Sequence, residues 1–172
     1  MTASDLRPTW ETASPAATEA LAAWLATHLR AGDVVELEGG LGAGKTAFTR
    51  GLVRGLGHPD PREVASPTFA LHHRYEGGRL PVDHLDLYRL PPDRDALARQ
   101  GLLDSLSDPG TITVLEWGER IQPRLAPRFV VHLDVLGEGR RRVFLTGPGA
   151  AELGPPPPDA AGIPGPFSGL RR

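Results

Sequence analysis

Apolar residues recur at helical spacing in three stretches of the chain. In the run ALAAWLATHLR, which begins two residues after Thr18, they fall on one face, as in an amphipathic helix. The residues around Thr18 could equally cap the first turn, because threonine is a good N-cap. The pattern predicts helices over residues 20–30, 47–56 and 93–106, the last of them broken at Gly101.

Short apolar and β-branched runs between these helices predict strands. We expect them at 34–40, at 66–75 and 80–88 with a turn at 76–78 between the two, at 111–117, and at 129–136 and 140–147, the last pair joined as a hairpin through Gly-Glu-Gly. Helices that come early and lie between strands favour the α/β class, as a three-layer α/β/α sandwich.

The character of the chain changes after residue 146. Residues 147–172 hold seven prolines and six glycines, a composition that buries too little apolar surface to offset the entropy of ordering. We therefore expect one domain over 1–146 and a flexible tail over 147–172. A ligand for a proline-recognising partner is the alternative interpretation of that tail.

Composition and charge exclude several classes of protein. The 172 residues include no cysteine, which removes disulfides, thiolate zinc sites and cysteine nucleophiles. The formal net charge is −2, without the basic surplus of a free-standing nucleic-acid binder, so a nucleic-acid role would pass through a partner. No membrane-spanning run and no secretory signal is evident, and we expect a cytoplasmic protein without a membrane role.

A glycine-rich motif follows the first predicted strand. Residues 39–46, GGLGAGKT, match G-x-x-x-x-G-K-[ST], the loop whose backbone N–H groups surround a phosphate. A lysine in this position reaches the β- and γ-phosphates, and the next hydroxyl binds Mg²⁺. Lys45 is the one lysine among 19 basic residues, which indicates a position that requires a compact ammonium and does not accept the planar guanidinium of arginine. The bland alternative is a surface turn.

A phosphate-binding loop needs a carboxylate at a neighbouring strand end to hold Mg²⁺. Glu116 ends one apolar run, and Asp86 ends another, with His84 on its strand face and Asp83 on the other face. Either acid could instead pair with an arginine or cap a helix. We expect Asp83 to be an ordinary exposed strand residue, and leave His84 open between a site residue and a half-buried structural histidine.

Several stretches together are similar to one family. LEGGLGAGKTAFTRGL, VASPTF, DHLDLYRL and LEWGER occur here in the order and spacing of TsaE, so the chain resembles TsaE from about Thr18 to Val143. The resemblance implies a P-loop NTPase-like sandwich with a mixed sheet. It implies an Mg²⁺-dependent ATPase that works with TsaB and TsaD to form threonylcarbamoyladenosine next to the anticodon of tRNAs reading codons that begin with A. ATP binding and hydrolysis would drive turnover of that complex, through which alone the chain would meet tRNA. Because no residue must act as an internal arginine finger, we expect slow hydrolysis by the chain alone and stimulation by TsaB–TsaD.

The resemblance also assigns residues. It implies that Lys45, Asp86 and Glu116 are catalytic, with Thr46 and Glu116 as Mg²⁺ ligands and residues 66–69 as a switch-like loop. The implied ATP contacts are Thr18, Gly42, Ala43, Gly44, Lys45, Thr46 and Ala47. Trp117 fits either beside the base or in the core.

One position departs from the family, which usually has aspartate where this chain has Gly40. Phosphate binding is expected to survive, while the role of that aspartate is in doubt. A small-molecule kinase, with Arg89, Arg94 and Arg99 as a lid, and a non-hydrolysing scaffold are the alternative functions. Arg140–Arg142 is either a solvated hairpin end or a local contact for tRNA.

Overall fold

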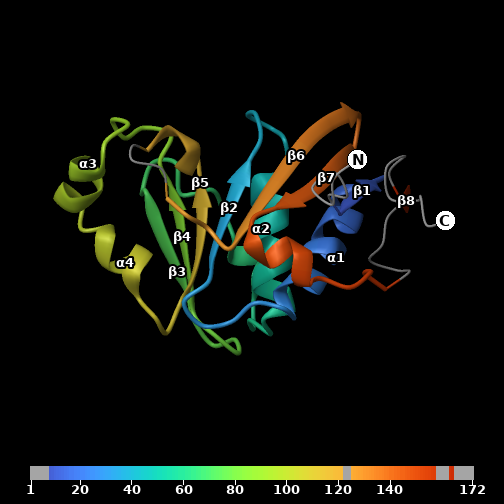
Figure 1. The fold of residues 1–172 in the computed structure, drawn as a ribbon, viewed down its shortest axis with the longest axis horizontal. Helices are drawn as coiled ribbons and strands as arrows, with labels where there is room; N and C mark the ends of the chain where they lie inside the picture. The colour runs from blue at the N-terminus through green and yellow to red at the C-terminus, as the bar shows by residue number, and fades with distance from the viewer. Residues whose placement is uncertain (1–7, 122–124, 158–162, 165–172) are drawn as a thin grey trace.

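The computed structural model describes residues 8–121, 125–157 and 163–164. The strands are β1 (Thr9–Thr12), β2 (Val34–Glu38), β3 (His72–Tyr75), β4 (Val82–Asp86), β5 (Ile112–Glu116), β6 (Phe129–Gly137), β7 (Arg140–Thr146) and β8 (Ile163–Pro164). They form one sheet in the order β3-β4-β5-β2-β6-β7-β1-β8 (Figure 1). β4, β5, β2 and β6 run parallel, and the other pairings are antiparallel, so the sheet is mixed.

Helices cover both faces of the sheet. They are α1 (Pro15–Ala26), α2 (Lys45–Gly55), α3 (Arg94–Arg99) and α4 (Leu103–Ser107), with 3-10 turns η2 (Pro61–Glu63), η3 (Gly118–Arg120) and η4 (Pro148–Glu152). α1 and α2 pack side by side, behind the sheet in Figure 1. α3 and α4 lie beside the β3–β4–β5 end (Figure 1). The described elements therefore form the α/β sandwich that the sequence predicts.

Strand alternation divides the core into two apolar clusters. Under α1 and α2, the larger one joins Phe48 and Leu52 to alternate strand residues such as Val114 and Val131. The smaller one, on the opposite face, gathers Leu85, Leu97 and Leu115 under α3. Because successive strand residues point to opposite faces, His84 and Asp86 share the α1–α2 side of β4, away from Leu85.

The first helix begins earlier than its apolar pattern predicts. Ser14 is the N-cap, its hydroxyl accepting from the Ala17 amide at 3.1 Å, and Pro15 occupies the first turn. Thr18 is therefore an interior, buried helix residue rather than the cap. Its hydroxyl shares a hydrogen bond of 2.7 Å with that of Thr12 on β1, a strand that the sequence analysis did not predict.

Elsewhere the predicted elements are largely confirmed. The helix over 93–106 is broken as expected, with Gly101 at φ +69° between α3 and α4. The hairpin of β6 and β7 closes through residues 137–139. The strand expected over 66–75 is shorter, because only His72–Tyr75 pairs with β4. Among the described residues, no helix is long and apolar enough to cross a bilayer.

The start of the expected tail belongs to the domain. η4 packs its Gly149 so closely that an added Cβ would lie 2.5 Å from the Phe129 ring, and Glu152 accepts from Arg128 at 2.7 Å. The composition of 147–172 hid this, because a short proline- and glycine-rich turn can still be fixed by a close contact and an ion pair. Residues 158–162 and 165–172 lie outside the described part.

Candidate functional site

A cavity of about 350 Å³ opens where β2, β4 and β5 end. Parallel strands that end together leave a crevice at their carboxyl edge, the usual ligand position in an open α/β sheet. Its lining combines the glycine-rich loop with strand-end acids, namely Leu41, Gly42, Ala43, Gly44, Lys45, Thr46, Ser66, Thr68, Asp86, Tyr88, Glu116 and Trp117.

The backbone of the glycine-rich loop adopts conformations that are unfavourable for residues with a side chain. Gly42 and Gly44 have φ of +74° and +107°, the left-handed region that glycine enters without steric cost. Gly39 is confined as well, because an added Cβ would lie 2.8 Å from the Leu133 carbonyl oxygen. At Gly40 an added Cβ meets nothing within 4 Å, so the aspartate usual in the family has room here.

Lys45 is buried at the start of α2, with 6% of the residue exposed. Its ammonium donates to the carbonyls of Gly39 at 2.7 Å and Gly40 at 3.0 Å and lies 4.4 Å from the centroid of the Trp117 ring. Burial lowers the pKa of Lys45 below its ordinary 10.5, while Glu116 and two other acids act in the opposite direction. The lysine thus folds back on its own loop, within the pocket that a phosphate would enter.

Asp86 is buried at the end of β4 and connects three segments. Its Oδ2 accepts from the hydroxyls of Thr68 at 2.6 Å and Ser66 at 3.2 Å, and its Oδ1 accepts from the Tyr88 amide at 2.9 Å. The hydroxyl-bearing loop that the sequence singled out is therefore tied to the acid that ends the neighbouring strand.

Glu116 is buried at the end of β5, beside Asp86 in the strand register. Its Oε1 lies 2.8 Å from Nε2 of His84, which is fully buried, and because a carboxylate only accepts, this contact places the imidazole proton on Nε2. His84 is thus fully buried rather than half-buried, and it contacts the cavity-lining acid Glu116.

The backbone beside the cavity is strained at two points. Among the described residues, Trp117 (φ +63°) and Leu71 (φ +66°) are the non-glycine residues with positive φ. Such a conformation costs on the order of 1–3 kcal/mol and is concentrated at functional sites. Trp117 follows Glu116 and lines the cavity, and Leu71 accepts from the Asp86 amide at 3.0 Å.

The donor set suits a hard cation and a polyphosphate. The hydroxyl of Thr46 and the carboxylates of Asp86 and Glu116 all line the same cavity, and Mg²⁺ prefers oxygen ligands of these kinds. The N-terminus of α2, which begins at Lys45, adds partial positive charge beside the cavity. In the chemistry of their donor atoms, these residues fit a magnesium–nucleotide complex.

Two expected contacts do not line this cavity. Thr18 is buried against Thr12, and Ala47 lies behind Thr46 in α2. Asp83 differs from expectation, since it is 1% exposed and hydrogen-bonded to His72 at 2.8 Å and to Arg74 at 3.1 Å. The physical reason is that β4 lies between β3 and β5 and is covered on both faces, so none of its residues is exposed.

A separate group of acids escaped the sequence analysis. Glu36, Glu38 and Glu119 place carboxylate oxygens within 4.8 Å of one another, and His132 Nδ1 lies 3.0 Å from Glu38. The signal in the sequence was the alternation of glutamates along β2. Glu36 is buried, and Glu38 and Glu119 are half-buried.

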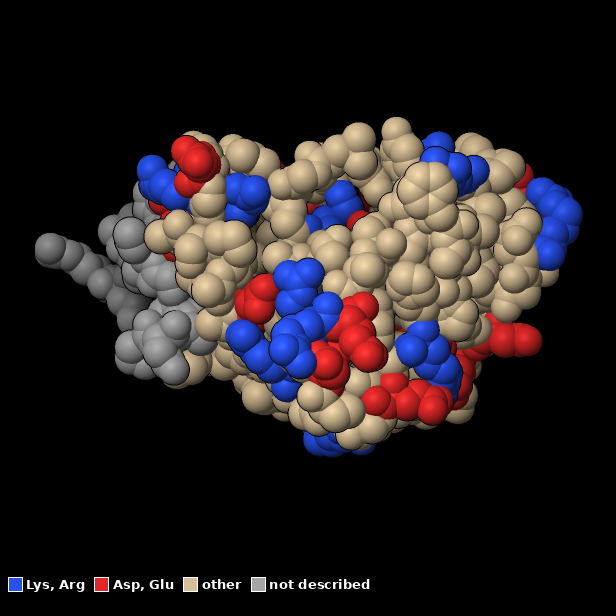
Figure 2. Space-filling model, turned by 180° about the vertical axis from the view of Figure 1, so that it is seen from behind, with Lys and Arg blue, Asp and Glu red and all other residues tan. Residues whose placement is uncertain are grey.

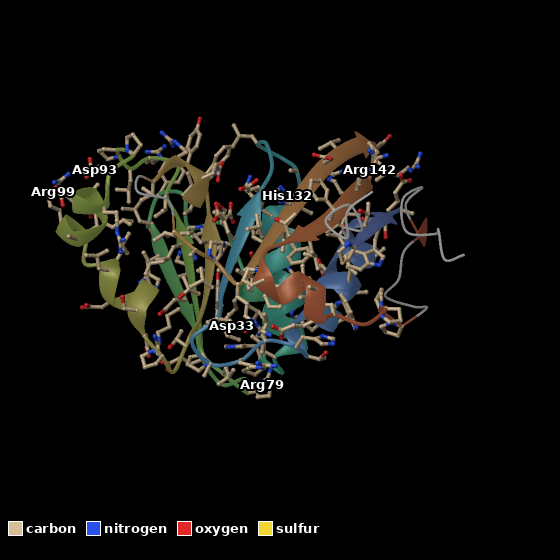
Figure 3. All side chains as sticks on the ribbon, in the orientation of Figure 1. Asp33, Arg79, Asp93, Arg99, His132 and Arg142 are labelled. Carbon is tan, nitrogen blue, oxygen red and sulfur yellow. The ribbon has the colours of Figure 1, made fainter. Side chains whose placement is uncertain are left out.

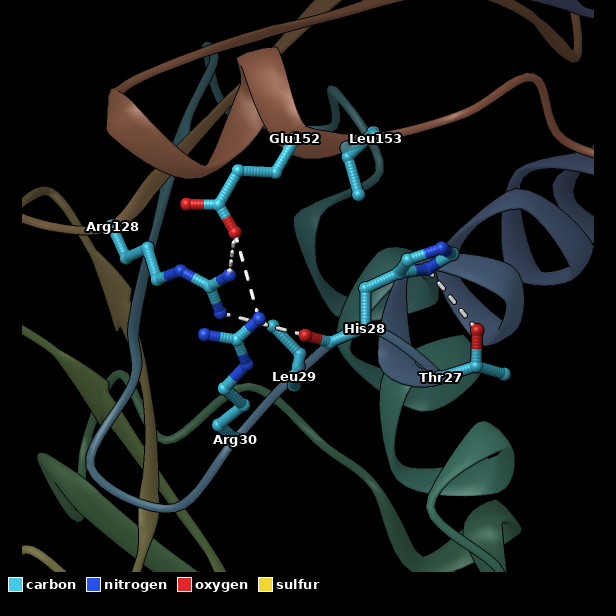
Figure 4. A pocket seen from close by; sticks show the side chains of 7 residues that line it. All are labelled: Thr27, His28, Leu29, Arg30, Arg128, Glu152 and Leu153. Carbon is cyan, nitrogen blue, oxygen red and sulfur yellow. Dashed lines mark hydrogen bonds and ion pairs between the residues drawn. The ribbon is translucent and has the colours of Figure 1, made fainter.

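A second cavity, of about 280 Å³, lies between α1 and η4 (Figure 4). Its cations are already matched, because Glu152 lies 2.7 Å from Arg128 and 3.7 Å from Arg30, while Arg128 also binds Asp33 at 2.6 Å. Figure 3 places Asp33, the partner of Arg128, at the lower edge of the sheet. Arg142 lies far from it, at the upper end of the hairpin. This cavity is a structural junction.

The outer face of α1 and α2 carries both charges. Figure 2 shows basic and acidic side chains intermingled over the described residues seen from this side. Arg50 and Arg54 both pair with Glu19, at 3.1 Å and 3.3 Å. Such mixing differs from the continuous basic stripe that binds a nucleic-acid backbone.

Comparisons with known proteins agree with this geometry. The sequence profile of the family "Threonylcarbamoyl adenosine biosynthesis protein TsaE" matches residues 12–143. The TsaE proteins of Bacillus subtilis and Streptomyces coelicolor are 36% and 43% identical over 81% and 64% of this chain, and 85% and 74% of their own. The crystal structure of Bacillus subtilis YdiB superposes with a TM-score of 0.63 at 31% identity, covering 81% of this chain and 85% of that one. The chain belongs to the TsaE family.

Proposed function

We propose that this chain is an Mg²⁺-dependent ATPase that works with TsaB and TsaD in forming threonylcarbamoyladenosine in tRNA. One observation carries the ATPase part: the loop that holds Lys45 and Thr46 and the strand-end acids Asp86 and Glu116 line a single cavity. Membership of the TsaE family supports the tRNA-modification part, because its curated members are named for that biosynthesis.

Lys45 and the loop amides would hold the phosphates. To do so, the ammonium exchanges the carbonyls of Gly39 and Gly40 for phosphate oxygens, a short movement within the same loop. Thr46 and Glu116 would hold Mg²⁺, which when bound neutralises charge on the β- and γ-phosphates. His84 keeps Glu116 oriented toward the cavity through their 2.8 Å contact.

We assign Asp86 to the attacking water. In the structure, its Oδ2 is already occupied by the hydroxyls of Ser66 and Thr68 and its Oδ1 by a backbone amide. Hydrolysis therefore requires the 66–69 loop to rearrange. A partner that moves this loop would raise the rate, so we expect slow turnover by the chain alone.

The chain is expected to meet tRNA through its partners rather than by itself. Its net charge is −2, and its described surface mixes both signs over the α1–α2 face. We place it in the cytoplasm with the tRNA it would help to modify. The proline-rich segment beyond η4 should be dispensable for ATP hydrolysis.

The test measures ATP turnover by the purified chain with Mg²⁺, alone and with TsaB–TsaD and substrate tRNA. We expect about 10⁻⁴–10⁻² per second alone and a clear rise with the complex, whereas kinases turn over at about 1–100 per second. Lys45→Ala should abolish both rates, with Arg54→Ala on the same helix as the control. Rapid phosphate transfer to a small acceptor, or no turnover with the complex present, would overturn the proposal.

A further inference from the structure

The guanidinium of Arg141, on β7, lies against the glycine-rich loop although the two segments are far apart in sequence. Its Nε donates to the Ala43 carbonyl at 2.7 Å and its Nη2 to the Gly42 carbonyl at 3.1 Å. Its Nη1 donates to the carbonyls of Gly137 at 3.3 Å and Arg140 at 2.8 Å. One planar group therefore joins the hairpin end to the loop.

The neighbouring arginines behave differently. Arg140 and Arg142 both pair with Glu11, at 3.3 Å and 3.1 Å, as ordinary surface cations do. Within the part of the chain that the structure describes, the hydrogen bonds of Arg141 all go to backbone carbonyls, and no carboxylate pairs with it. Among the described residues, Arg141 therefore has no ion-pair partner within 4 Å.

Local strand geometry directs Arg141 to this place. The register of β6 and β7 shifts between Val135 and Gly137, and Arg141 pairs with Val135 at the edge of that irregularity. Bulges of this kind re-aim side chains and are common next to binding sites. The irregularity also presents the Gly137 carbonyl as an acceptor for the same guanidinium.

The contact with the Ala43 carbonyl fixes a peptide plane that matters for phosphate binding. In a trans peptide the C=O and the following N–H point in opposite directions. Holding the Ala43 carbonyl on the outside of the loop turns the Gly44 amide away from Arg141, and Gly44 lines the cavity. Without an external contact a glycine-rich loop is flexible, because glycine is free to adopt many conformations.

We infer that Arg141 is a positioning residue of the nucleotide site, which orders the glycine-rich loop from behind and adds a positive charge to it. The inference rests on the proposed ATP-binding function. Since loop amides contact phosphates in the ground state and the transition state alike, losing Arg141 should weaken ATP binding and leave kcat nearly unchanged.

The test titrates ATP with Mg²⁺ into the parent protein, Arg141→Gln, Arg141→Lys and the control Arg140→Gln by calorimetry, followed by steady-state kinetics. We expect Kd and KM of Arg141→Gln to rise by about tenfold or more, which corresponds to about 1.4 kcal/mol. Arg141→Lys should fall between this variant and the parent, since an ammonium lacks the planar fork that reaches both carbonyls. Arg140→Gln should bind like the parent.

Amide hydrogen exchange of residues 42–44 in the nucleotide-free variants is the second readout. Arg141→Gln should exchange faster there than Arg140→Gln, with equal melting temperatures. If the parent itself does not bind ATP, the proposed function fails, while the exchange data still decide the role of Arg141. Parent-like affinity and exchange in Arg141→Gln, or an equal loss in Arg140→Gln, would overturn the inference. If Arg141→Gln does not fold, parent-like affinity in Arg141→Lys would overturn it.

Discussion

Replacing Gly51 by alanine should displace α2, the helix that begins at the end of the glycine-rich loop. Gly51 and Gly55 lie one turn apart on α2 and face α1. A Cβ at residue 51 would lie 2.3 Å from the Glu19 carbonyl oxygen and 2.7 Å from the Ala22 Cβ. Ordinary contacts of a Cβ begin at 3.4 Å, so the helices must separate by about 1.1 Å to accept it.

The expected cost follows from two opposing effects. Overpacking a well-packed core costs about 1–3 kcal/mol, while alanine in place of glycine within a helix returns up to about 1 kcal/mol. We expect a net loss of about 1–2 kcal/mol in the free energy of unfolding, or a melting temperature lower by about 2–8 °C. Because Lys45 and Thr46 begin α2, the displacement should also reduce ATP hydrolysis in the folded fraction.

Urea unfolding followed by circular dichroism measures the stability of Gly51→Ala, Ala22→Gly and the double variant. Ala22→Gly removes the 2.7 Å contact but leaves the backbone carbonyl at 2.3 Å, so the double variant should recover no stability. Gly51→Ala with parent-like or greater stability would refute the close packing of α1 and α2. Recovery in the double variant would show that the Ala22 methyl group is the obstacle.

Three further predictions concern charge. Because burial lowers the pKa of Lys45 below 10.5, ATP affinity should fall as pH rises through that lowered pKa, a limb that Lys45→Ala should lack in titrations. The lowered pKa also affects the free energy of unfolding. Between the folded-state pKa of Lys45 and 10.5, the unfolded chain binds more protons than the folded chain, so the contribution of Lys45 to stability rises with pH over this window. Glu116→Gln should lower kcat by about 10–100-fold with an unchanged melting temperature, and an unchanged kcat would contradict its role at the metal. Arg128→Met should destabilise the fold by about 1–3 kcal/mol in urea because the buried Asp33 carboxylate loses its ion-pair partner and keeps, among the described residues, only the Arg30 amide as a donor. Arg30→Met, with its exposed side chain and 3.7 Å contact, should change little.

Local patterns predicted most of the fold, and the exceptions depend on distant contacts. The break at Gly101 and the hairpin at 129–147 follow from nearby residues. β1 does not, because its four residues become a strand by pairing with β7 and β8 from the other end of the chain, and Glu11 meets Arg142 in the β7 pairing. Asp83 looked exposed for the same reason, since only the sheet order shows that β4 is covered on both sides.

The residues of the site also fall into those that the sequence predicts and those that depend on distant contacts. Lys45, Asp86 and Glu116 each stand at the carboxyl end of a strand or just beyond it, and parallel strands bring such ends together whatever the intervening helices do. Arg141 lies on a strand that runs antiparallel to its neighbour, and a register shift near its position decides where its guanidinium lies. No periodicity in the sequence marks that shift, so the sequence left Arg140–Arg142 between a solvated hairpin end and a tRNA contact. The strand ends predict which acids line the cavity, and the irregular hairpin places the guanidinium that contacts the glycine-rich loop beside them.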